Sequence, residues 1–294
     1  MSTAVGAEKP RDTMSTAVGA EKPRDTMSTA VGAEKPRVIM SAADGAEKPR
    51  VIMSTAVGAE KPRVIIVEGE IAVGKTVLVS LLASALGATP VYEPVDKWMS
   101  SGILEKFYAD PARYGYAFQT FVYVTRIQEI QRAVAEAHRE GRRPFFILER
   151  SPVTDEIFME LQRGAVADVE IDVMYEAWRR TFAQLLPIDL ATATVLYLKP
   201  SLETSMRRLA SRARPGENTG GVPLEYQRRL RRAHEALLEG AHAEEFPQLA
   251  GRPPPYSRGA VKIVPPSIAE LNFRDAGPEQ QVALSAILGL LADE

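Results

Sequence analysis

Residues 69–76 combine the side chains and the spacing that a phosphate-binding loop requires. Gly69, Gly74, Lys75 and Thr76 stand at the defining positions of the pattern G-x-x-x-x-G-K-T. Glycine lets the backbone curl so that successive N–H groups point at phosphate oxygens. In such a loop the lysine ammonium reaches the β- and γ-phosphates of a nucleotide, and the hydroxyl that follows binds Mg²⁺. The loop residues expected to add backbone contacts are Glu70, Ile71, Ala72 and Val73.

The segments on either side of the loop support this interpretation. The run 64–67 before the loop is β-branched, and residues 77–86 after it are apolar and suited to a helix. Strand, loop and helix is the order in which a phosphate loop occurs, and the helix N-terminus adds a positive dipole. The alternative, a glycine-rich turn with an incidental lysine, does not explain this context.

A carboxylate follows the next apolar run of the chain. Residues 89–92 predict a second strand, and Glu93 comes directly after it, with Trp98 close behind. Ligands of a parallel sheet bind at the carboxyl ends of its strands, where a carboxylate can take a proton from an attacking hydroxyl. Trp98 offers a flat apolar wall for a base. A surface glutamate at a turn and a half-buried tryptophan remain the alternative.

An acid and a base follow the third apolar run in the same way. Glu149 and Arg150 come directly after residues 144–148. Glu149 can hold Mg²⁺ through water, and Arg150 can neutralise charge that develops on a transferred phosphoryl group. A helix N-terminal acid beside a solvated arginine remains the alternative.

Three arginines precede a glycine-rich segment in the second half of the chain. Arg208, Arg212 and Arg214 are spaced by four and two residues, which places them near one another at the end of a predicted helix. The glycines in 215–221 allow this segment to open and close. A mobile cationic segment that excludes water is what a lid over a phosphoryl donor needs. A solvated basic helix face is the alternative.

The apolar pattern predicts a scaffold that brings these strand ends together. Runs expected to be buried parallel strands lie at 64–67, 89–92, 144–148, 194–198 and 260–264. Helices are expected at 77–86, 118–139, 171–186, 202–213, 224–239 and 280–291. The alternation predicts an α/β P-loop fold with a five-stranded parallel sheet, helices on both faces and an Arg-rich lid. Residues 251–259, with three consecutive prolines, predict an exposed loop.

The first 62 residues differ from the rest of the chain. The sequence Met-Ser-Thr-Ala-Val-Gly-Ala-Glu-Lys-Pro-Arg recurs, with some drift, every 13 residues from Met1, Met14, Met27, Met40 and Met53. Its copies have few large apolar side chains and cannot bury enough surface to offset their ordering entropy. We expect a disordered tail of tandem repeats over 1–62 and one folded domain over 63–294. Met53 could therefore start a shorter functional chain.

Composition argues against several other classes of protein. The 294 residues carry a formal charge of −2, which argues against a general nucleic-acid binder, and they include no cysteine for disulfides or thiolate metal sites. No apolar run reaches the ~18 residues of a membrane helix, and the N-terminus lacks the apolar core of a secretory signal. Acids and regular prolines in the repeats disfavour a mitochondrial transit peptide. We expect a cytoplasmic protein.

Together the motifs resemble those of the deoxynucleoside kinases. This family includes the deoxycytidine and deoxyguanosine kinases, the insect multisubstrate enzyme and, more distantly, the herpesvirus thymidine kinases. The resemblance covers most of 64–240 and returns near 261–273. It rests on G-x4-G-K-T, Glu93-Pro94-Val95-x-x-Trp98, Phe118-Gln119-Thr120, Glu149-Arg150-Ser151, Arg212-Ala213-Arg214 and Pro223-Leu224-Glu225-Tyr226, in this order. Each motif alone is unspecific, whereas the set is specific.

The resemblance implies roles for these residues. Glu93 is the base that activates the 5′-hydroxyl of a deoxyribose, and Arg150 orients that side of the substrate. Arg208, Arg212 and Arg214 form a lid over ATP. The residues implied to hold the nucleoside are Trp98 and Phe118 around the base, Gln119 at the base edge, and Tyr108 and Glu217 at the 3′-hydroxyl.

The chain departs from the family pattern in three places. Met159, with Phe158 beside it, stands where many relatives stack a phenylalanine on the base, so the resemblance implies that Met159 contacts the substrate. The lid sequence Arg-Pro-Gly-Glu that ends at Glu217 is closer to the herpesvirus enzymes than to the animal ones. Residues 251–259 form an insert where relatives contact adenine.

The same resemblance points to two charged residues that choose the base. Arg126 lies two helical turns after Gln119, so both side chains share one face. With Asp155 it can form a bidentate pair whose carboxylate accepts a hydrogen bond from an exocyclic amine and which crowds the place of thymine's methyl group. This predicts deoxycytidine and purine deoxynucleosides ahead of thymidine. An ordinary structural salt bridge is the alternative.

We therefore predict an ATP-dependent kinase that converts deoxynucleosides to their 5′-monophosphates for salvage. By the resemblance it forms a homodimer through the helices at 118–139 and 171–186. The alternatives are a thymidine kinase of viral type, a nucleoside monophosphate kinase, and a nucleotide-binding regulatory module without catalysis. A monophosphate acceptor would need cations in its site rather than the acid at Glu93.

Overall fold

The computed structural model describes residues 61–212, 214, 222–251 and 260–292. The predicted repeats up to residue 60, Glu217, and residues 252–259 of the predicted loop lie outside the described residues.

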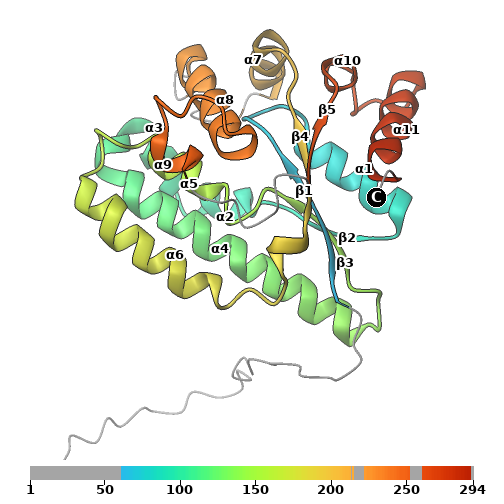
Figure 1. The fold of residues 1–294 in the computed structure, drawn as a ribbon, viewed down its shortest axis with the longest axis horizontal. Helices are drawn as coiled ribbons and strands as arrows, with labels where there is room; N and C mark the ends of the chain where they lie inside the picture. Colours follow the sequence, from blue (N-terminus) through green and yellow to red (C-terminus); the bar gives the residue numbers. More distant parts are fainter. Residues whose placement is uncertain (1–60, 213, 215–221, 252–259, 293–294) are drawn as a thin grey trace, which may run out of the picture. The chain divides into compact units, whose positions relative to one another are not determined.

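Five parallel strands form the centre of the domain (Figure 1). In chain order they are β1 (Arg63–Glu68), β2 (Thr89–Val91), β3 (Phe145–Glu149), β4 (Thr194–Leu198) and β5 (Val261–Val264). Their order in the sheet is β2-β3-β1-β4-β5, and every pairing is parallel. This confirms the predicted sheet, and each strand agrees with its predicted run to within one residue at either end. Because β1 is central, the loop that follows it reaches the middle of the sheet's carboxyl edge.

Helices cover both faces of the sheet, as the alternation of side chains along β1 requires (Figure 1). Ile65 and Val67 belong to one apolar cluster, and Val64 and Ile66 belong to the other. The first cluster includes residues of α1 (Lys75–Leu86), α10 (Pro266–Ala269) and α11 (Pro278–Ala292). The second includes residues of α4 (Pro111–Arg139), α5 (Asp155–Glu160) and α8 (Leu224–Glu239). Burial on both faces explains why the strands are almost wholly apolar.

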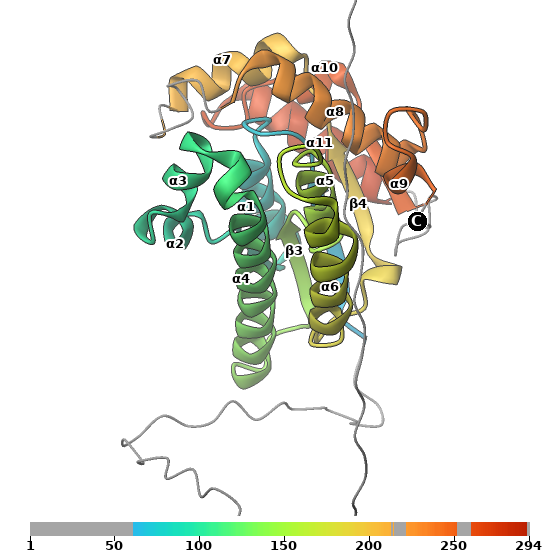
Figure 2. The ribbon, with the colours of Figure 1, turned by 90° about the vertical axis from the view of Figure 1, so that its left-hand side faces the viewer.

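The longest helix, α4, begins earlier than predicted. The Asp110 side chain accepts a hydrogen bond from the Arg113 amide at 3.1 Å, and Pro111 occupies the first turn. The helix predicted at 171–186 consists of a π-helical turn, η1 (Glu170–Tyr175), followed by α6 (Glu176–Ala183). α6 lies beside α4 (Figure 2).

Several short helices were not predicted. Besides α5 and α10 they are α2 (Val95–Ser100), α3 (Ile103–Ala109), η2 (Leu190–Thr192) and α9 (Pro247–Ala250). Each is too short to show the 3.6-residue apolar period by which a helix is recognised. α2 and α3 nevertheless matter for the site, because they pack Trp98, Leu104 and Phe107 against α4.

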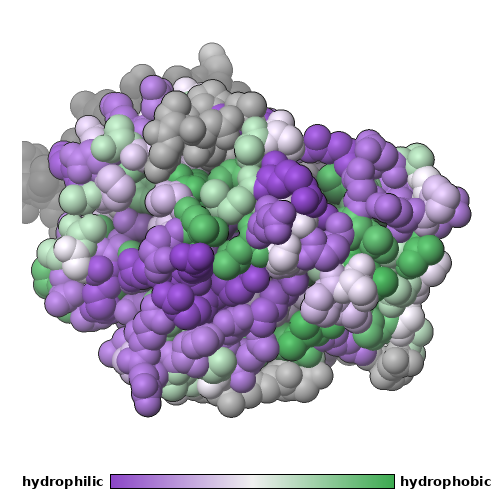
Figure 3. All heavy atoms as spheres, turned by 90° about the horizontal axis from the view of Figure 1, so that it is seen from above, coloured by the Kyte–Doolittle hydropathy of each residue, from purple (hydrophilic) through white to green (hydrophobic). Residues whose placement is uncertain are grey.

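The helices α7 (Leu202–Arg212) and α8 lie on the face shown in Figure 3. Hydrophilic residues cover most of this face, and hydrophobic residues appear between them in small separate patches. Within the described part of the chain, no helix is long and apolar enough to cross a membrane.

Candidate active site

A cavity of about 660 Å³ opens where β1, β2 and β3 end. This edge of a parallel sheet is the usual place for a ligand. The predicted site residues that line it are Ile71, Ala72, Gly74, Lys75, Thr76, Glu93, Trp98, Tyr108, Phe118, Gln119, Arg126, Glu149, Arg150, Asp155, Arg208, Arg212 and Arg214. The structure therefore brings residues from distant parts of the chain to one cavity. Gly69, Glu70 and Val73 belong to the same loop but do not line the cavity.

The phosphate loop depends on backbone conformations that favour glycine. Gly69 and Gly74 have φ angles of 144° and 107°, and Ala72 has a φ angle of 64°. A Cβ atom at Gly69 would lie 2.4 Å from the Leu198 carbonyl oxygen, so no other residue fits there. The Lys75 ammonium donates to the Gly69 and Glu70 carbonyls at 3.3 and 2.7 Å.

The charge on Lys75 is sensitive to what binds beside it. The side chain is buried, and burial, with a smaller effect of Arg150, lowers the pKa of Lys75 to about 7. Glu93 and Glu149 oppose this shift. An anion placed next to the ammonium would raise the pKa again, so phosphate binding and protonation of Lys75 favour each other.

Thr76 and Glu149 meet at the start of α1. The Thr76 hydroxyl donates to the Glu149 Oε1 atom at 2.6 Å, and Glu149 is the last residue of β3, paired with Val67 of β1. Burial, with the nearby charge of Glu93, raises the pKa of Glu149. A hydroxyl and a carboxylate are hard oxygen donors of the kind that Mg²⁺ takes together with water and phosphate oxygens. Among the described residues, no group of three His, Cys, Asp or Glu side chains is placed to hold a metal ion. A metal ion at this corner would therefore need water or phosphate oxygens as further ligands.

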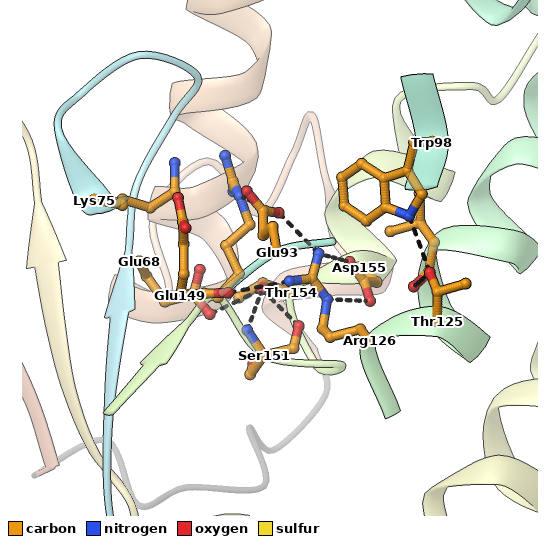
Figure 4. A network of polar contacts seen from close by, with 12 residues as sticks. Glu68, Lys75, Glu93, Trp98, Thr125, Arg126, Glu149, Ser151, Thr154 and Asp155 are labelled. Atoms are coloured by element: carbon orange, nitrogen blue, oxygen red, sulfur yellow. Dashed lines mark hydrogen bonds and ion pairs between the residues drawn. The ribbon is translucent and has the colours of Figure 1, made fainter. Parts of the chain in front are cut away.

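Glu93 lies between two guanidinium groups, and Figure 4 shows its contact with that of Arg126. Its Oε1 atom is 2.9 Å from Arg126 Nη2 and 3.3 Å from Arg150 Nε. Burial alone would raise the pKa of this carboxyl, but Arg150 and Arg126 outweigh it and lower the pKa to about 2. Glu93 is therefore ionised at neutral pH and can accept a hydrogen bond or a proton.

Arg126 joins Glu93 to Asp155. Its Nε and Nη2 atoms each lie 3.0 Å from one oxygen of the Asp155 carboxylate, which is a bidentate pair. Its Nη1 atom donates to the Glu149 carbonyl at 3.1 Å. The structure thus contains the predicted Arg126–Asp155 pair, and it adds a contact to Glu93 that the sequence did not predict. Asp155 is fully buried, and burial raises its pKa while Arg126 opposes the shift.

An apolar wall lies beside this charged cluster. Phe107 and Phe118 stack with ring centroids 4.7 Å apart, and Trp98 meets Phe118 edge to face at 6.0 Å. The Trp98 Nε1 atom donates to the Thr125 hydroxyl at 2.9 Å, which fixes the plane of the indole (Figure 4). Gln119 is buried and lines the cavity next to this wall. The wall suits a flat ring whose edge reaches Gln119.

Met159 lies away from the cavity, contrary to the expectation for its position. It is buried among Val166, Ile171 and Tyr175. Its neighbour Phe158 lines the cavity instead. The two side chains leave α5 on different sides because consecutive residues of a helix point about 100° apart.

Arg150 is held from several directions. Its backbone has a φ angle of 62°, and its amide donates to the Val67 carbonyl at 3.0 Å. The guanidinium carbon lies 4.7 Å from the centroid of the Phe158 ring, and Nη1 lies 3.3 Å from His234 Nε2. Burial and Arg150 lower the pKa of His234 well below its usual value, so the imidazole is neutral. Since the His234 Nδ1 atom donates to the Leu230 carbonyl at 2.7 Å, Nε2 accepts from Arg150.

The three predicted lid arginines differ in their surroundings. Arg208 donates to the Val73 carbonyl at 2.7 Å and to the Leu271 carbonyl at 2.8 Å, so it ties the phosphate loop to the turn after α10. Arg212 and Arg214 line the cavity at the end of α7. The Arg-Pro-Gly-Glu segment that was expected to close over the donor lies outside the described residues, apart from Arg214.

Sequence reasoning missed several groups around the cavity. Glu68 is fully buried, accepts a hydrogen bond from the Thr154 hydroxyl at 2.8 Å, and has a pKa that burial raises to about 7. The sequence did contain a pattern that indicates Glu68, because this residue follows an apolar run just as Glu149 does. Glu270 and residues 272–275 also line the cavity, and no local pattern predicted this. His234 gave no signal either, since it sits in a highly charged helix.

The parallel sheet, the glycine-dependent loop and its buried lysine define a P-loop nucleotide-binding protein of the phosphoryl-transfer class. A sequence model of the deoxynucleoside kinases matches residues 65–253, and the chain belongs to the deoxynucleoside kinase family.

Individual relatives agree with this assignment. A probable deoxycytidine kinase of Fowlpox virus is 32% identical over 61% of this chain and 73% of its own length. A deoxyguanosine kinase of Lactobacillus acidophilus is 28% identical over 59% of this chain and 74% of its own. Human deoxycytidine kinase is 26% identical over 58% of this chain and 74% of its own length. The predicted family and enzyme class are thereby confirmed: the chain is a kinase of deoxynucleosides that uses a nucleotide phosphate donor. Nothing in the comparisons favours a nucleoside monophosphate kinase.

Proposed function

We propose that the enzyme transfers the γ-phosphoryl group of ATP to the 5′-hydroxyl of deoxynucleosides, with deoxycytidine and purine deoxynucleosides preferred. The observation that carries this proposal is the position of Glu93. Its ionised carboxylate lies in the same cavity as the phosphate-loop residue Lys75 and the aromatic wall around Trp98. A hydroxyl placed between the loop and the wall would meet a hydrogen-bond acceptor there.

Glu93 acts as the base in this proposal. Its low pKa makes it a weak base, which suits a phosphoryl transfer with a loose transition state, because the hydroxyl proton then leaves late. Arg150, held by Phe158 and His234, orients the 5′ side of the substrate and stabilises charge on the transferred group.

The donor side is assigned to the phosphate loop and the arginines of α7. Lys75 and the loop amides bind the phosphates of ATP, and Arg208, Arg212 and Arg214 cover them. Thr76 and Glu149 would hold Mg²⁺, which neutralises phosphate charge when bound. The oxygen donors at this corner support this assignment.

The acceptor base is assigned to the aromatic wall and the charged pair behind it. Trp98 and Phe118 enclose the base, Gln119 bonds its edge, and Asp155 accepts from an exocyclic amine. Tyr108 and Glu217 are proposed to hold the 3′-hydroxyl by family resemblance, and Tyr108 does line the cavity. A purely structural Arg126–Asp155 salt bridge remains the competing interpretation, because buried ion pairs often only support a fold.

The decisive experiment measures ADP production from ATP with deoxycytidine, with deoxycytidine monophosphate, and without acceptor. Of these three reactions, we expect ADP production only in the one that contains deoxycytidine. Turnover with the monophosphate would indicate the rival kinase class, and no turnover with either would indicate a binding module. A panel of the four deoxynucleosides then ranks the bases.

We also propose a homodimer that uses α4 and the η1–α6 segment. This segment exposes the large apolar side chains Val173, Met174 and Trp178, and the residues just outside its ends expose Val169 and Leu185. Such a cluster is typical of a surface that packs against another chain. Light scattering at micromolar concentration should show a dimer, and Trp178→Glu should shift it to monomer, whereas a monomeric wild type would refute the proposal.

A further inference from the structure

The inner face of α8 carries two polar side chains that contact the phosphate loop from behind the cavity. Gln227 and Arg231 are four residues apart, so they lie on the same side of the helix. The Gln227 Nε2 atom donates to the Ile71 carbonyl at 2.9 Å, and the Arg231 Nε atom donates to the Glu70 carboxylate. Two consecutive residues of the loop are therefore bound to α8.

Glu70 is an acid within a loop that binds anions, so its charge needs a partner. Its side chain is fully buried, whereas that of Arg231 is 16% exposed. A buried carboxylate without a counter-charge is strongly destabilised and would repel the phosphates of a donor. Arg231 neutralises the carboxylate and keeps it on the side of the loop that faces α8. The same guanidinium donates to the Pro200 carbonyl after β4, which anchors Arg231 independently of the loop.

A third contact holds the other end of the loop. Arg208 of α7 donates to the Val73 carbonyl at 2.7 Å. The carbonyls of Ile71 and Val73 therefore both accept hydrogen bonds from helices outside the loop. A loop whose carbonyls are turned outward has its N–H groups free to point at phosphate.

We propose that Arg231, together with Glu70 and Gln227, positions the phosphate loop for donor binding. This rests on the proposed role of the loop as the ATP site. Arg231 and Gln227 are positioning residues, since neither lines the cavity and both act through the loop backbone. Their loss should weaken binding of the donor and leave binding of the nucleoside unchanged.

The test compares Arg231→Met, Glu70→Gln, the double variant and Gln227→Met with Arg232→Met as a matched control. Arg232 is the next residue of α8, and its Nε atom pairs with Glu245 at 2.7 Å in an exposed ion pair. The measurements are KM for ATP, KM for deoxycytidine, ADP binding by calorimetry, and melting temperature. Gln227→Met leaves no unpaired charge, so it remains informative even if Arg231→Met folds poorly.

We expect Arg231→Met to raise KM for ATP and Kd for ADP about tenfold, because it leaves Glu70 buried without a counter-charge. KM for deoxycytidine should change less than about twofold, and Gln227→Met should raise KM for ATP about threefold through loss of one hydrogen bond. The double variant should recover most of the loss seen in Arg231→Met. Equal changes in both KM values, no change, an equal effect of Arg232→Met, or no recovery in the double variant would each overturn the proposal. If the wild type phosphorylates no nucleoside while ADP binding still follows this pattern, the positioning role stands and the proposed function fails.

Discussion

The two halves of the cavity are built in different ways. The half that we propose to face the donor is formed mainly by one continuous loop, Gly69 to Thr76, part of which lines the cavity and whose shape depends on backbone conformation. The half that we propose to face the acceptor brings together Glu93, Arg126, Asp155 and Arg150 from four separate places in the chain. Its shape depends on buried charges that neutralise one another.

This difference predicts how each half responds to change. In the donor half a substitution acts through local backbone geometry, as at Gly69, where a Cβ atom would strike the Leu198 carbonyl. In the acceptor half a single substitution leaves a partner charge buried and unpaired. Arg126→Met, for example, is expected to cost about 3–5 kcal/mol of stability because it leaves the fully buried Asp155 without its ion-pair partner, whereas Glu93 keeps Arg150.

The largest effect is expected from Glu93→Gln. The amide keeps the shape of the side chain but cannot accept the hydroxyl proton, so kcat should fall about 100-fold or more. Binding of ADP should be unchanged, since the donor half is intact. Steady-state kinetics and calorimetry check both points, with Glu140→Gln, at a side chain that is 51% exposed, as a control. Activity within a few-fold of the wild type would remove Glu93 from the role of base.

The next largest effect concerns the choice of base. Removing both charges with Arg126→Met and Asp155→Ala should shift the ratio of kcat/KM for deoxycytidine over thymidine about tenfold toward thymidine, because a charged hydrogen-bond acceptor is lost. The wild type should prefer deoxycytidine. A wild type that prefers thymidine would refute the base assignment, and an unchanged ratio in the double variant would identify the pair as purely structural.

The number of protons taken up when a ligand binds should distinguish the donor half from the acceptor half without any substitution. Lys75 has a pKa of about 7 in the empty site, and bound phosphate should raise it, so ADP binding takes up a proton. Free Lys75 is more often neutral at pH 8 than at pH 6, so the proton uptake that accompanies ADP binding should be larger at pH 8 than at pH 6. Calorimetry in buffers of different ionisation enthalpy measures this.

Deoxycytidine provides the matched control for proton uptake. Glu93 has a pKa of about 2 and is already ionised across this range, so nucleoside binding should take up no proton. Equal uptake for both ligands would contradict the difference between the halves.

The smallest effect is expected from a chain that starts at Met53. The repeats before it lack side chains to bury, so we propose that they contribute nothing to either half of the site. Activity and melting temperature should be nearly the same as for the full chain. A large loss of stability would show instead that the repeats pack on the domain.

Local pattern was enough to predict the sheet and the phosphate loop. Short apolar runs identified every strand, because strands buried on both faces must be apolar. The phosphate loop was predicted because its function requires glycine, lysine and threonine at set positions. Short helices such as α2 and α3 were missed, since six or seven residues carry too little periodicity to be recognised.

The acceptor half shows the limit of such reasoning. The sequence predicted the Arg126–Asp155 pair, yet the bridge from Arg126 to Glu93 appeared only in the structure, as did the support of Arg150 by His234. The family resemblance placed Met159 in the cavity, but in the structure Phe158 lines the cavity and Met159 is buried elsewhere.

Residue types alone specified the strands, the phosphate loop and the acids at the strand ends, because each follows from short-range geometry. Packing decided which charges meet, which aromatic side chain reaches the cavity and which helix supports the loop. These outcomes depend on contacts between segments that lie tens of residues apart in the chain. Neighbouring residues cannot encode them, since a buried charge is stable only beside a partner that the fold brings to it.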